Sequence, residues 1–389
     1  MKRGQTGRYE VSSFGGESVR AFMPASLPPD PPVSLEGSLQ TRLERAALAL
    51  GRLDSLATLL PDTGLFLYTY VRKEALLSSQ IEGTQSSLSD LLLFEIEEAP
   101  GVPIDDVVEV SNYVAALEHG VRRLQEGFPL SNRLIREIHG VLLARGRGSE
   151  KEPGEFRRSQ NWIGGNRPGT AVFVPPPPHL VPECMSDLEG FLHAEGDGLP
   201  VLIRAGLAHV QFETVHPFLD GNGRIGRLLI TLLLCQAQVL RQPLLYLSLH
   251  LKQNRAEYYR LLDLVRRDGD WEAWLAFFLD GVRETAEGAV STAQRLVALF
   301  QADRVRIQSR GRAAGSALRV YDAIKERPLT SLQEICRRSG LSFPATSAGM
   351  NVLMELGITR ELTGRRRDRL FGYSQYLTIL SEGTEPPAP

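Results

Sequence analysis

The sequence predicts a mainly α-helical protein with a small β-hairpin flap in its core region and a winged-helix domain near its C-terminal end. Apolar residues recur at three- and four-residue spacing along most of the chain, which is the pattern of amphipathic helices. One short run of β-type residues, 171–174, lies between a glycine-rich stretch and four prolines. After a basic linker at 309–312, three helical patterns precede two short strand-like runs.

The composition is that of an ordinary soluble globular protein with two or three domains. The chain has 389 residues, of which 42% are hydrophobic and 23% are charged, and its formal net charge is −2. No excess of charge points to nucleic acid or to an acidic substrate as the main partner. Any basic patch must therefore be local.

Cysteine usage and hydropathy indicate a cytoplasmic protein. Cys184, Cys235 and Cys336 lie far apart and form no Cys-x-x-Cys pair, which argues against a disulfide framework and a cysteine zinc site. The first residues are polar, unlike those of a secretory signal. The apolar run 228–234 is far shorter than the roughly 20 residues that span a bilayer. We expect a reducing compartment and no membrane partner.

An extended N-terminal arm and a helical region are expected over the first third of the chain. Residues 1–33 are rich in Gly, Ser and Pro, which is typical of an extended segment. The helical region, 34–127, begins with a helix from residue 35. Two more helices are expected over 65–82, stopping at Gly83, and around 107–126.

The core region at 128–308 is also helical by its periodicity. Its first helix follows the N-cap candidate Ser131. Between the first and second core helices, the glycine-rich segment 153–178 is expected to form the flap. The expected helices are 132–144, 180–193, 201–215, 224–239, 254–267 and 271–307.

The winged-helix domain is expected at 313–380, followed by a tail at 381–389. Its helices are expected over 317–325, 331–339 and 345–356. The basic run 360–369, at the expected wing, could contact phosphates, and the last of these helices could enter a major groove of DNA. That helix offers Thr346, Ser347 and Asn351, but no Arg or Lys to bind guanine. DNA binding and a role in dimerisation or in docking a protein are two open alternatives.

Twelve residues from His216 to Arg227, HPFLDGNGRIGR, indicate the chemistry. One helix ends at Pro217 and another begins near Arg224, so the free N–H groups and the positive end of a helix dipole face the turn. Gly221 and Gly223 let the backbone approach a ligand closely. This arrangement is suited to cradling phosphate groups.

The charged residues of this segment suit the transfer of a phosphate-containing group. Arg224 and Arg227 are three residues apart, so they share a helix face and can both reach the cradle. Asp220 is placed to bind Mg²⁺, which usually takes one or two carboxylates together with phosphate oxygens. His216 can accept a proton from an attacking hydroxyl near neutral pH.

Two other nucleotide-binding motifs are excluded. Gly221, Gly223 and Gly226 have the spacing of the dinucleotide fingerprint, but no hydrophobic strand precedes them and no acidic residue follows at 241–248. The chain also contains no Gly-x-x-x-x-Gly-Lys-Ser/Thr sequence. The phosphates are therefore not bound by a Walker loop.

The segment from His216 to Arg227 resembles the full signature of Fic-domain proteins, and the resemblance extends over about residues 35–279. It implies a Fic helical-bundle core that transfers AMP from ATP, with Mg²⁺, to a Ser, Thr or Tyr hydroxyl of a target protein. In that pattern His216 is the general base and Asp220 is the Mg²⁺ ligand. Arg227 binds the γ-phosphate. The resemblance assigns the contacts with ATP to Gly221, Asn222, Gly223, Arg224, Gly226 and Arg227.

A second motif lies at Ser78, Glu82 and Gly83. An anion at a helix C-terminus is disfavoured by about 0.3–1 kcal/mol, and such local exceptions often mark a functional site. These residues resemble the Fic inhibitory motif, Ser/Thr-x-x-x-Glu-Gly/Asn. The resemblance implies that Glu82 forms an ion pair with Arg227 at the γ-phosphate position and so inhibits the enzyme.

The resemblance also implies that the flap clamps a target segment by strand addition, with Thr170, Val172 and Phe173 as the docking residues. Tyr258 is a candidate adenine contact, although packing is the commoner use of such a residue. His209 shares a helix face with His216, but no third metal ligand is evident, so we expect His209 to be structural.

We therefore expect an autoinhibited protein adenylyltransferase that uses ATP and Mg²⁺, modifies another protein or itself, and could form a homodimer. One alternative is a DNA-binding regulator whose Fic core senses a nucleotide. Another is a Fic enzyme that removes AMP or uses a different nucleotide donor.

Overall fold

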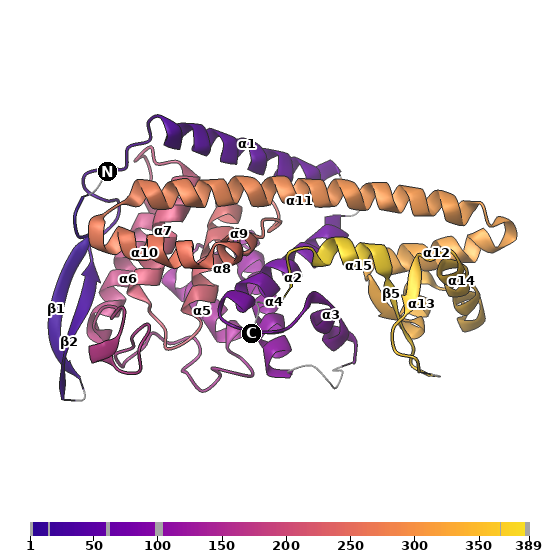
Figure 1. Cartoon of the computed structure of the whole chain (residues 1–389), viewed down its shortest axis with the longest axis horizontal. Coiled ribbons are helices and arrows are strands. Elements are labelled where there is room, and N and C mark those ends of the chain that lie inside the picture. Colours follow the sequence, from indigo (N-terminus) through magenta and orange to yellow (C-terminus); the bar gives the residue numbers. More distant parts are fainter. Residues whose placement is uncertain (1–2, 15, 60–62, 98–103, 366, 386–389) are drawn as a thin grey trace.

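One long helix, α11 (Trp271–Gln308), runs along most of the molecule, as Figure 1 shows. The computed structural model describes residues 3–14, 16–59, 63–97, 104–365 and 367–385. A helical body gathers along the first part of α11, and a smaller C-terminal unit lies at its far end. Helix α1 (Ser38–Leu59) packs lengthwise against α11 within the body (Figure 1).

The helices of the body follow the apolar periodicity of the sequence closely. Ser131 caps the helix that begins at Asn132 as expected, because its hydroxyl accepts a hydrogen bond from the backbone N–H of Leu134. Two short helices, at 88–97 and 248–253, were not expected. Besides α1 and α11, the body contains α2 (Thr63–Ile81), α3 (Leu88–Glu97), α4 (Ile104–Gln125), α5 (Asn132–Leu142), α6 (Val181–His193), α7 (Val201–Val215), α8 (Asn222–Gln236), α9 (Ser248–Gln253) and α10 (Arg255–Asp268).

Helices α7 and α8 form the centre of the body and position the segment between them. Every residue of α7 from Leu202 to Val215 is buried, and so is nearly all of α8. A helix that is buried all round belongs to the core of a protein. Helices α4 and α5 also pack against α8. The segment 216–221 is therefore anchored at both ends in the core.

The N-terminal arm is not simply extended, as the sequence analysis expected for residues 1–33. Strands β1 (Gly7–Phe14) and β2 (Glu17–Pro24) form an antiparallel hairpin that pairs Gly7 with Pro24. The alternation of Val19 and Ala21, which are buried, with exposed Arg20 is the strand signal that the Gly and Pro content obscured.

The flap is smaller than the expected hairpin. One isolated β-bridge joins Ile163 to Phe173, and a short 3₁₀ turn, η1 (Pro168–Thr170), lies between them. Strand pairing cannot extend beyond this bridge, because the prolines at 175–178 have no N–H to donate. The backbone N–H of Phe22 in β2 donates to Val174 O over 2.8 Å. The N-terminal hairpin therefore supports the flap.

The C-terminal unit contains α12 (Ala314–Glu326), α13 (Leu332–Ser339) and α14 (Phe343–Glu355), which match the three expected helices. Its antiparallel sheet has the order β3-β5-β4, one strand more than expected. The strands are β3 (Leu329–Ser331), β4 (Thr359–Glu361) and β5 (Leu370–Tyr373), and a further helix, α15 (Ser374–Ser381), follows them. The identification of this unit as a winged helix stays a prediction.

Polar side chains at the end of α13 and on α14 are engaged within the protein. Arg337 and Arg338 both form ion pairs with Glu334. In α14, Thr346 is buried, whereas Asn351 is exposed. These contacts reduce the positive charge and the polar surface that α13 and α14 offer to nucleic acid.

The end of the chain returns to the body. Lys73 and Gln80 of α2 donate hydrogen bonds to the backbone carbonyls of Glu382 and Thr384, at 2.7 Å and 2.9 Å. The first residues of the tail expected at 381–389 therefore contact α2. Residues 386–389 lie outside the described residues. None of the described helices is both long and apolar enough to cross a bilayer.

Candidate functional site

The turn between α7 and α8 begins at His216. This residue ends α7 with a left-handed backbone, at φ 48° and ψ 60°. Pro217 cannot continue the helix, and Gly221, at φ +75°, turns the chain into α8. The first N–H groups of α8 have no partner within the helix, so they face the turn with the positive end of the dipole.

Asn222 closes this turn with its side chain. Its Oδ1 accepts a hydrogen bond from Phe218 N, and its Nδ2 donates to Phe218 O, both over 2.8 Å. The residue is buried. The amide therefore braces the loop, while Asn222 also lines the cavity, so its assignment to phosphate stays a prediction.

Two residues outside the signature, Arg157 and His139, support the turn through hydrogen bonds and ring stacking. The backbone carbonyls of His216 and Pro217 accept hydrogen bonds from Arg157, through its Nε and its backbone N–H, both over 2.9 Å. The Arg157 Nη2 also donates to Pro176 O of the flap, over 2.5 Å. His139 stacks on Phe218 at a ring separation of 3.7 Å. Arg157 therefore braces the turn and the flap together, and His139 supports Phe218.

A cavity of about 250 Å³ lies over the turn. Residues from four parts of the chain line it: the end of α2, the segment after α5, the turn itself and the start of α8. They are Glu82, Arg147, His216, Leu219, Asp220, Gly221, Asn222, Gly223 and Arg224. The cavity therefore brings together most of the residues of the His216 segment.

His216 is a neutral imidazole in this structure at neutral pH. Burial, together with the nearby positive charge of Arg157, lowers the pKa of its ring to about 4. Its Nδ1 is buried, and the backbone of Glu213 lies close to the ring. A neutral imidazole can accept a proton, as a general base must.

The second motif, Ser78, Glu82 and Gly83, lies against Arg227. Ser78 accepts two hydrogen bonds from this guanidinium, one at its Oγ over 2.8 Å and one at its backbone carbonyl over 3.0 Å. The Glu82 Oε1 accepts a third from Arg227 Nη2 over 2.6 Å. Burial raises the pKa of Glu82, but the charge of Arg227 more than offsets this and leaves the pKa below its usual value. The expected ion pair is therefore present in the structure.

Glu82 also lies over the first turn of α8. A Cβ atom placed on Gly223 would overlap the Glu82 carboxylate. The carboxylate therefore occupies space directly beside a helix N-terminus, where anions bind favourably. Gly83, which follows it at φ +105°, needs the backbone freedom of glycine.

Arg224 is paired with two carboxylates. Its Nη1 lies 2.8 Å from Glu109 Oε1 and its Nη2 lies 3.3 Å from Asp220 Oδ1. The second oxygen of Glu109 pairs with Arg147 over 2.6 Å. Glu109 and Arg147 were not predicted, because they lie on α4 and on the segment after α5, far from the signature in sequence.

Asp220 suits Mg²⁺ as a single ligand. Its carboxylate borders the cavity, and its Oδ1 accepts a hydrogen bond from Gly221 N over 2.5 Å. The described residues contain no cluster of three or more His, Cys, Asp or Glu that could bind a metal by itself. Mg²⁺ commonly takes one or two protein carboxylates and completes its shell with water and substrate phosphates, so one carboxylate is compatible with it.

Two residues assigned to ATP lie in the core instead. Tyr258 is buried, and its hydroxyl is hydrogen-bonded to His209 Nε2 over 2.8 Å, so Tyr258 and His209 are structural. Its neighbour Tyr259 is the exposed tyrosine. Gly226 leaves room for the carboxylate of Glu213, which a Cβ at position 226 would overlap. The assignments of Tyr258 and Gly226 to ATP are therefore corrected.

The flap residues differ in exposure. The side chain of Val172 is 80% exposed, whereas Phe173 is buried and packs against Phe22 of β2. Thr170 is exposed, and its hydroxyl is hydrogen-bonded within the flap turn. Phe173 therefore anchors the flap, and Val172 is the apolar side chain that it presents.

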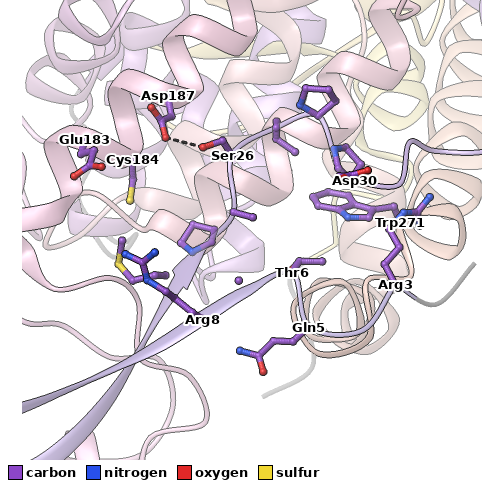
Figure 2. Close-up of a pocket in the computed structure, with 17 residues that line it drawn as sticks. Arg3, Gln5, Thr6, Arg8, Ser26, Asp30, Glu183, Cys184, Asp187 and Trp271 are labelled. Atoms are coloured by element: carbon purple, nitrogen blue, oxygen red, sulfur yellow. Dashed lines mark hydrogen bonds between the residues drawn. The ribbon is translucent and has the colours of Figure 1, made fainter.

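A larger hollow, of about 470 Å³, lies between the N-terminal arm and α6 (Figure 2). Arg8, Ser26, Cys184 and Asp187 border it, and Ser26 donates a hydrogen bond to Asp187 over 2.8 Å. Its lining shares no residue with the cavity at His216. The larger hollow is therefore separate from the cavity at His216.

Comparison with known families relates two parts of the chain to one family. Residues 40–122 match the Fic/DOC family N-terminal region, and residues 129–234 match the Fic/DOC family. The second match includes the whole segment from His216 to Arg227.

Curated relatives carry the name protein adenylyltransferase Fic. The protein of Culex quinquefasciatus is 32% identical over 257 residues, which cover 64% of this chain and 47% of the relative. That of Drosophila grimshawi is 32% identical over 188 residues, which cover 48% of this chain and 36% of the relative. The chain thus spans less than half the length of these two relatives.

Solved structures share the fold at low identity. A Fic family protein from Desulfovibrio desulfuricans G20 aligns with a TM-score of 0.57 at 22% identity, over 88% of this chain and 97% of that one. A Fic-domain-containing signalling protein from Bacteroides thetaiotaomicron aligns with a TM-score of 0.52 at 20% identity, over 64% of this chain and 95% of that one.

Proposed function

Because the chain carries a Fic N-terminal region and a Fic domain, and so belongs to the Fic/DOC family, we propose that it is an autoinhibited protein adenylyltransferase. It transfers the AMP part of ATP to a Ser, Thr or Tyr hydroxyl of a target protein or of itself. The observation that carries this proposal is the cavity at the start of α8, which His216, Asp220 and Arg224 line together.

The start of α8 supports the binding of a polyphosphate. Its backbone N–H groups and dipole attract an anion, and Gly223 leaves room for one. Arg224 borders the cavity. Arg227 lies close to it as well, because its ion-pair partner Glu82 also lines the cavity. Guanidinium groups suit phosphates because their planar donors match two oxygens at once.

The proposed reaction is a displacement at the α-phosphorus of ATP. The acceptor hydroxyl oxygen forms a bond to this phosphorus, and the bond from phosphorus to the oxygen that bridges the α- and β-phosphates breaks. Pyrophosphate leaves with the electron pair of the broken bond. A ring nitrogen of His216 accepts the hydroxyl proton, which its neutral form permits. Arg224 and the N–H groups of α8 stabilise the negative charge on the phosphates.

Asp220 is the residue that would hold Mg²⁺ at this site. When bound, the ion supplies positive charge that polarises the phosphate oxygens. Asp220 borders the cavity and is fixed by its hydrogen bond with Gly221 N, so its carboxylate is oriented without the ion.

The contact of Glu82 with Arg227 supports autoinhibition. The carboxylate takes one of the donors of Arg227 and lies beside Gly223, so it occupies the place that suits a phosphate. A terminal phosphate and the Glu82 carboxylate would compete for the same positive groups and repel one another. ATP would then bind weakly or in an unproductive position until Glu82 moves away.

The flap is the proposed docking site for the target segment. Val172 presents an exposed apolar side chain, and Arg157 ties the flap to the backbone of His216. An extended target segment that pairs with the flap would lie close to the catalytic turn. Strand addition of this kind accepts varied sequences, because backbone groups form most of its hydrogen bonds.

Position-labelled ATP tests the reaction. The Glu82→Gly protein is incubated with ATP labelled at the α- or the γ-phosphate, alone and with cell lysate. We expect label on protein from the α position only, and none when His216→Ala is added to the same protein. Label from the γ position would indicate a kinase-like reaction, and absence of label from either position on any protein would contradict the proposal.

A further inference from the structure

The segment that follows α5 crosses directly over the catalytic turn. In the sequence Arg145-Gly146-Arg147-Gly148, both glycines have a left-handed backbone, at φ +74° and φ +87°. A Cβ on Gly148 would lie 2.8 Å from Asp220 Oδ2, and one on Gly146 would lie 3.2 Å from Val108 Cγ1. Only glycine fits these positions without strain, so the backbone conformation around Arg147 is specific.

This backbone directs Arg147 toward the phosphate cradle. Arg147 lines the same cavity as His216, Asp220 and Arg224. Its side chain remains 53% exposed, unlike that of Arg224, which is 3% exposed. Arg147 is therefore a positive group that a ligand entering the cavity can reach.

Glu109 fixes the position of this guanidinium. The Glu109 side chain is 3% exposed and lies between two arginines, 2.6 Å from Arg147 Nη2 and 2.8 Å from Arg224 Nη1. The charges of Arg147 and Arg224 are balanced by the carboxylates of Glu109 and Asp220, so the cluster is held together by alternating charges. A guanidinium has five N–H donors, so the contact with Glu109 leaves donors of Arg147 for a second acceptor.

We propose that Arg147 is a further binding residue of the nucleotide site, which contacts the polyphosphate of ATP, and that Glu109 is the positioning residue that orients Arg147 and Arg224. This inference rests on the proposed function, since it concerns the same cavity. A planar guanidinium at the rim of a helix N-terminus gives phosphate oxygens a charged donor from a second direction.

The rival interpretation is an ordinary surface ion pair. Exposed ion pairs contribute little, because water solvates both partners well. The Arg147–Glu109 pair differs, since Glu109 is almost fully buried and also forms an ion pair with Arg224. The two interpretations predict different binding behaviour.

The test measures binding of ATP, pyrophosphate and adenosine to the Glu82→Gly protein by calorimetry, with and without Arg147→Ala. We expect Arg147→Ala to weaken ATP and pyrophosphate binding about tenfold or more, and to leave adenosine binding unchanged. Arg145→Ala is the matched control, since Arg145 is an exposed arginine of the same segment that does not line the cavity. Arg147→Lys keeps the charge and should recover part of the affinity.

The outcomes separate this inference from the proposed function. If the Glu82→Gly protein binds ATP and Arg147→Ala binds it equally well, Arg147 is a surface residue and the inference is overturned. If Glu82→Gly binds neither ATP nor pyrophosphate, the proposed function itself fails. Glu109→Gln should weaken pyrophosphate binding in a protein that retains its helical circular dichroism, and unchanged binding would remove the positioning role.

Discussion

The carboxylate of Glu82 lies 2.6 Å from Nη2 of Arg227, a residue 145 positions further along the chain. Ser78, one helical turn before Glu82, bonds the same guanidinium. The side chain of Arg227 is 2% exposed and that of Glu82 is 34% exposed. The arginine is therefore fixed in the core, and the glutamate is the partner that can withdraw.

Replacing Glu82 should activate the protein. Glu82→Gly removes the carboxylate from beside Gly223, so we expect AMP transfer to rise about tenfold or more, by analogy with removing a competing charged group. Glu82→Gln is the informative comparison, because it keeps the shape but not the charge. Rates are measured as label transferred from the α-phosphate of ATP. Equal rates for wild type and Glu82→Gly would remove the inhibitory role.

The same substitution should lower stability. Arg227 is buried, and losing its ion-pair partner leaves a buried charge that only Ser78 contacts directly through hydrogen bonds among the described residues. We expect the melting temperature to fall by several degrees in Glu82→Gly, and to recover when ATP is added, because ligand binding stabilises the folded state. A melting temperature unchanged by the substitution and by ATP would contradict this.

Arg157 should be essential to the loop. It is buried and donates to carbonyls of the turn and the flap, so Arg157→Ala leaves several carbonyls without a partner. Each unsatisfied buried group costs about 1–3 kcal/mol. Urea denaturation should show a large loss of unfolding free energy. Arg158→Ala, at the exposed neighbouring position, should change little. Comparable effects of the two substitutions would refute the bracing role.

His216 should titrate well below an ordinary histidine. Its pKa is lowered to about 4 by burial and by Arg157, so the ring stays neutral from pH 8 down to about pH 5 and gains its proton only near pH 4. Histidine-labelled NMR measures this, with the signal assigned by its absence in His216→Ala. A midpoint near the unperturbed value of about 6.5 would show that the ring is solvated.

Gly226 should be intolerant of a side chain for steric reasons. In Gly226→Ala, the added Cβ would overlap Glu213 and lie 3.3 Å from Phe212 Cδ1. We expect a loss of about 1–3 kcal/mol of unfolding free energy. Gly190→Ala is the matched control, since Gly190 also lies inside a helix, α6, but has nothing within 4 Å of the new Cβ. That control should be neutral or stabilising by up to about 1 kcal/mol.

Periodicity and local signals predicted the helices and the catalytic turn. Ser131 caps α5, and α7 and α8 lie on either side of the turn at His216, as the spacing of apolar residues and the position of Pro217 indicated. These features depend on neighbouring residues, so the sequence pattern carries them directly.

Features that depend on distant contacts were not predictable in this way. Glu109 has the appearance of an ordinary helix-surface acid, and only the packing of α4 against α8 places it beside Arg224. Asn222 was assigned to phosphate, but its side-chain amide forms hydrogen bonds with the backbone of Phe218. The pairing of β1 with β2 was missed because glycine and proline dominate the composition around these strands.

Intact-protein mass spectrometry tests the central claim most directly. Glu82→Gly, and the same protein carrying His216→Ala, are each incubated with ATP and Mg²⁺, alone and with candidate protein mixtures. The proposal predicts the added mass of AMP on the first protein or on a partner, and no addition with the second. AMP addition that persists without His216 would contradict the catalytic role of this turn.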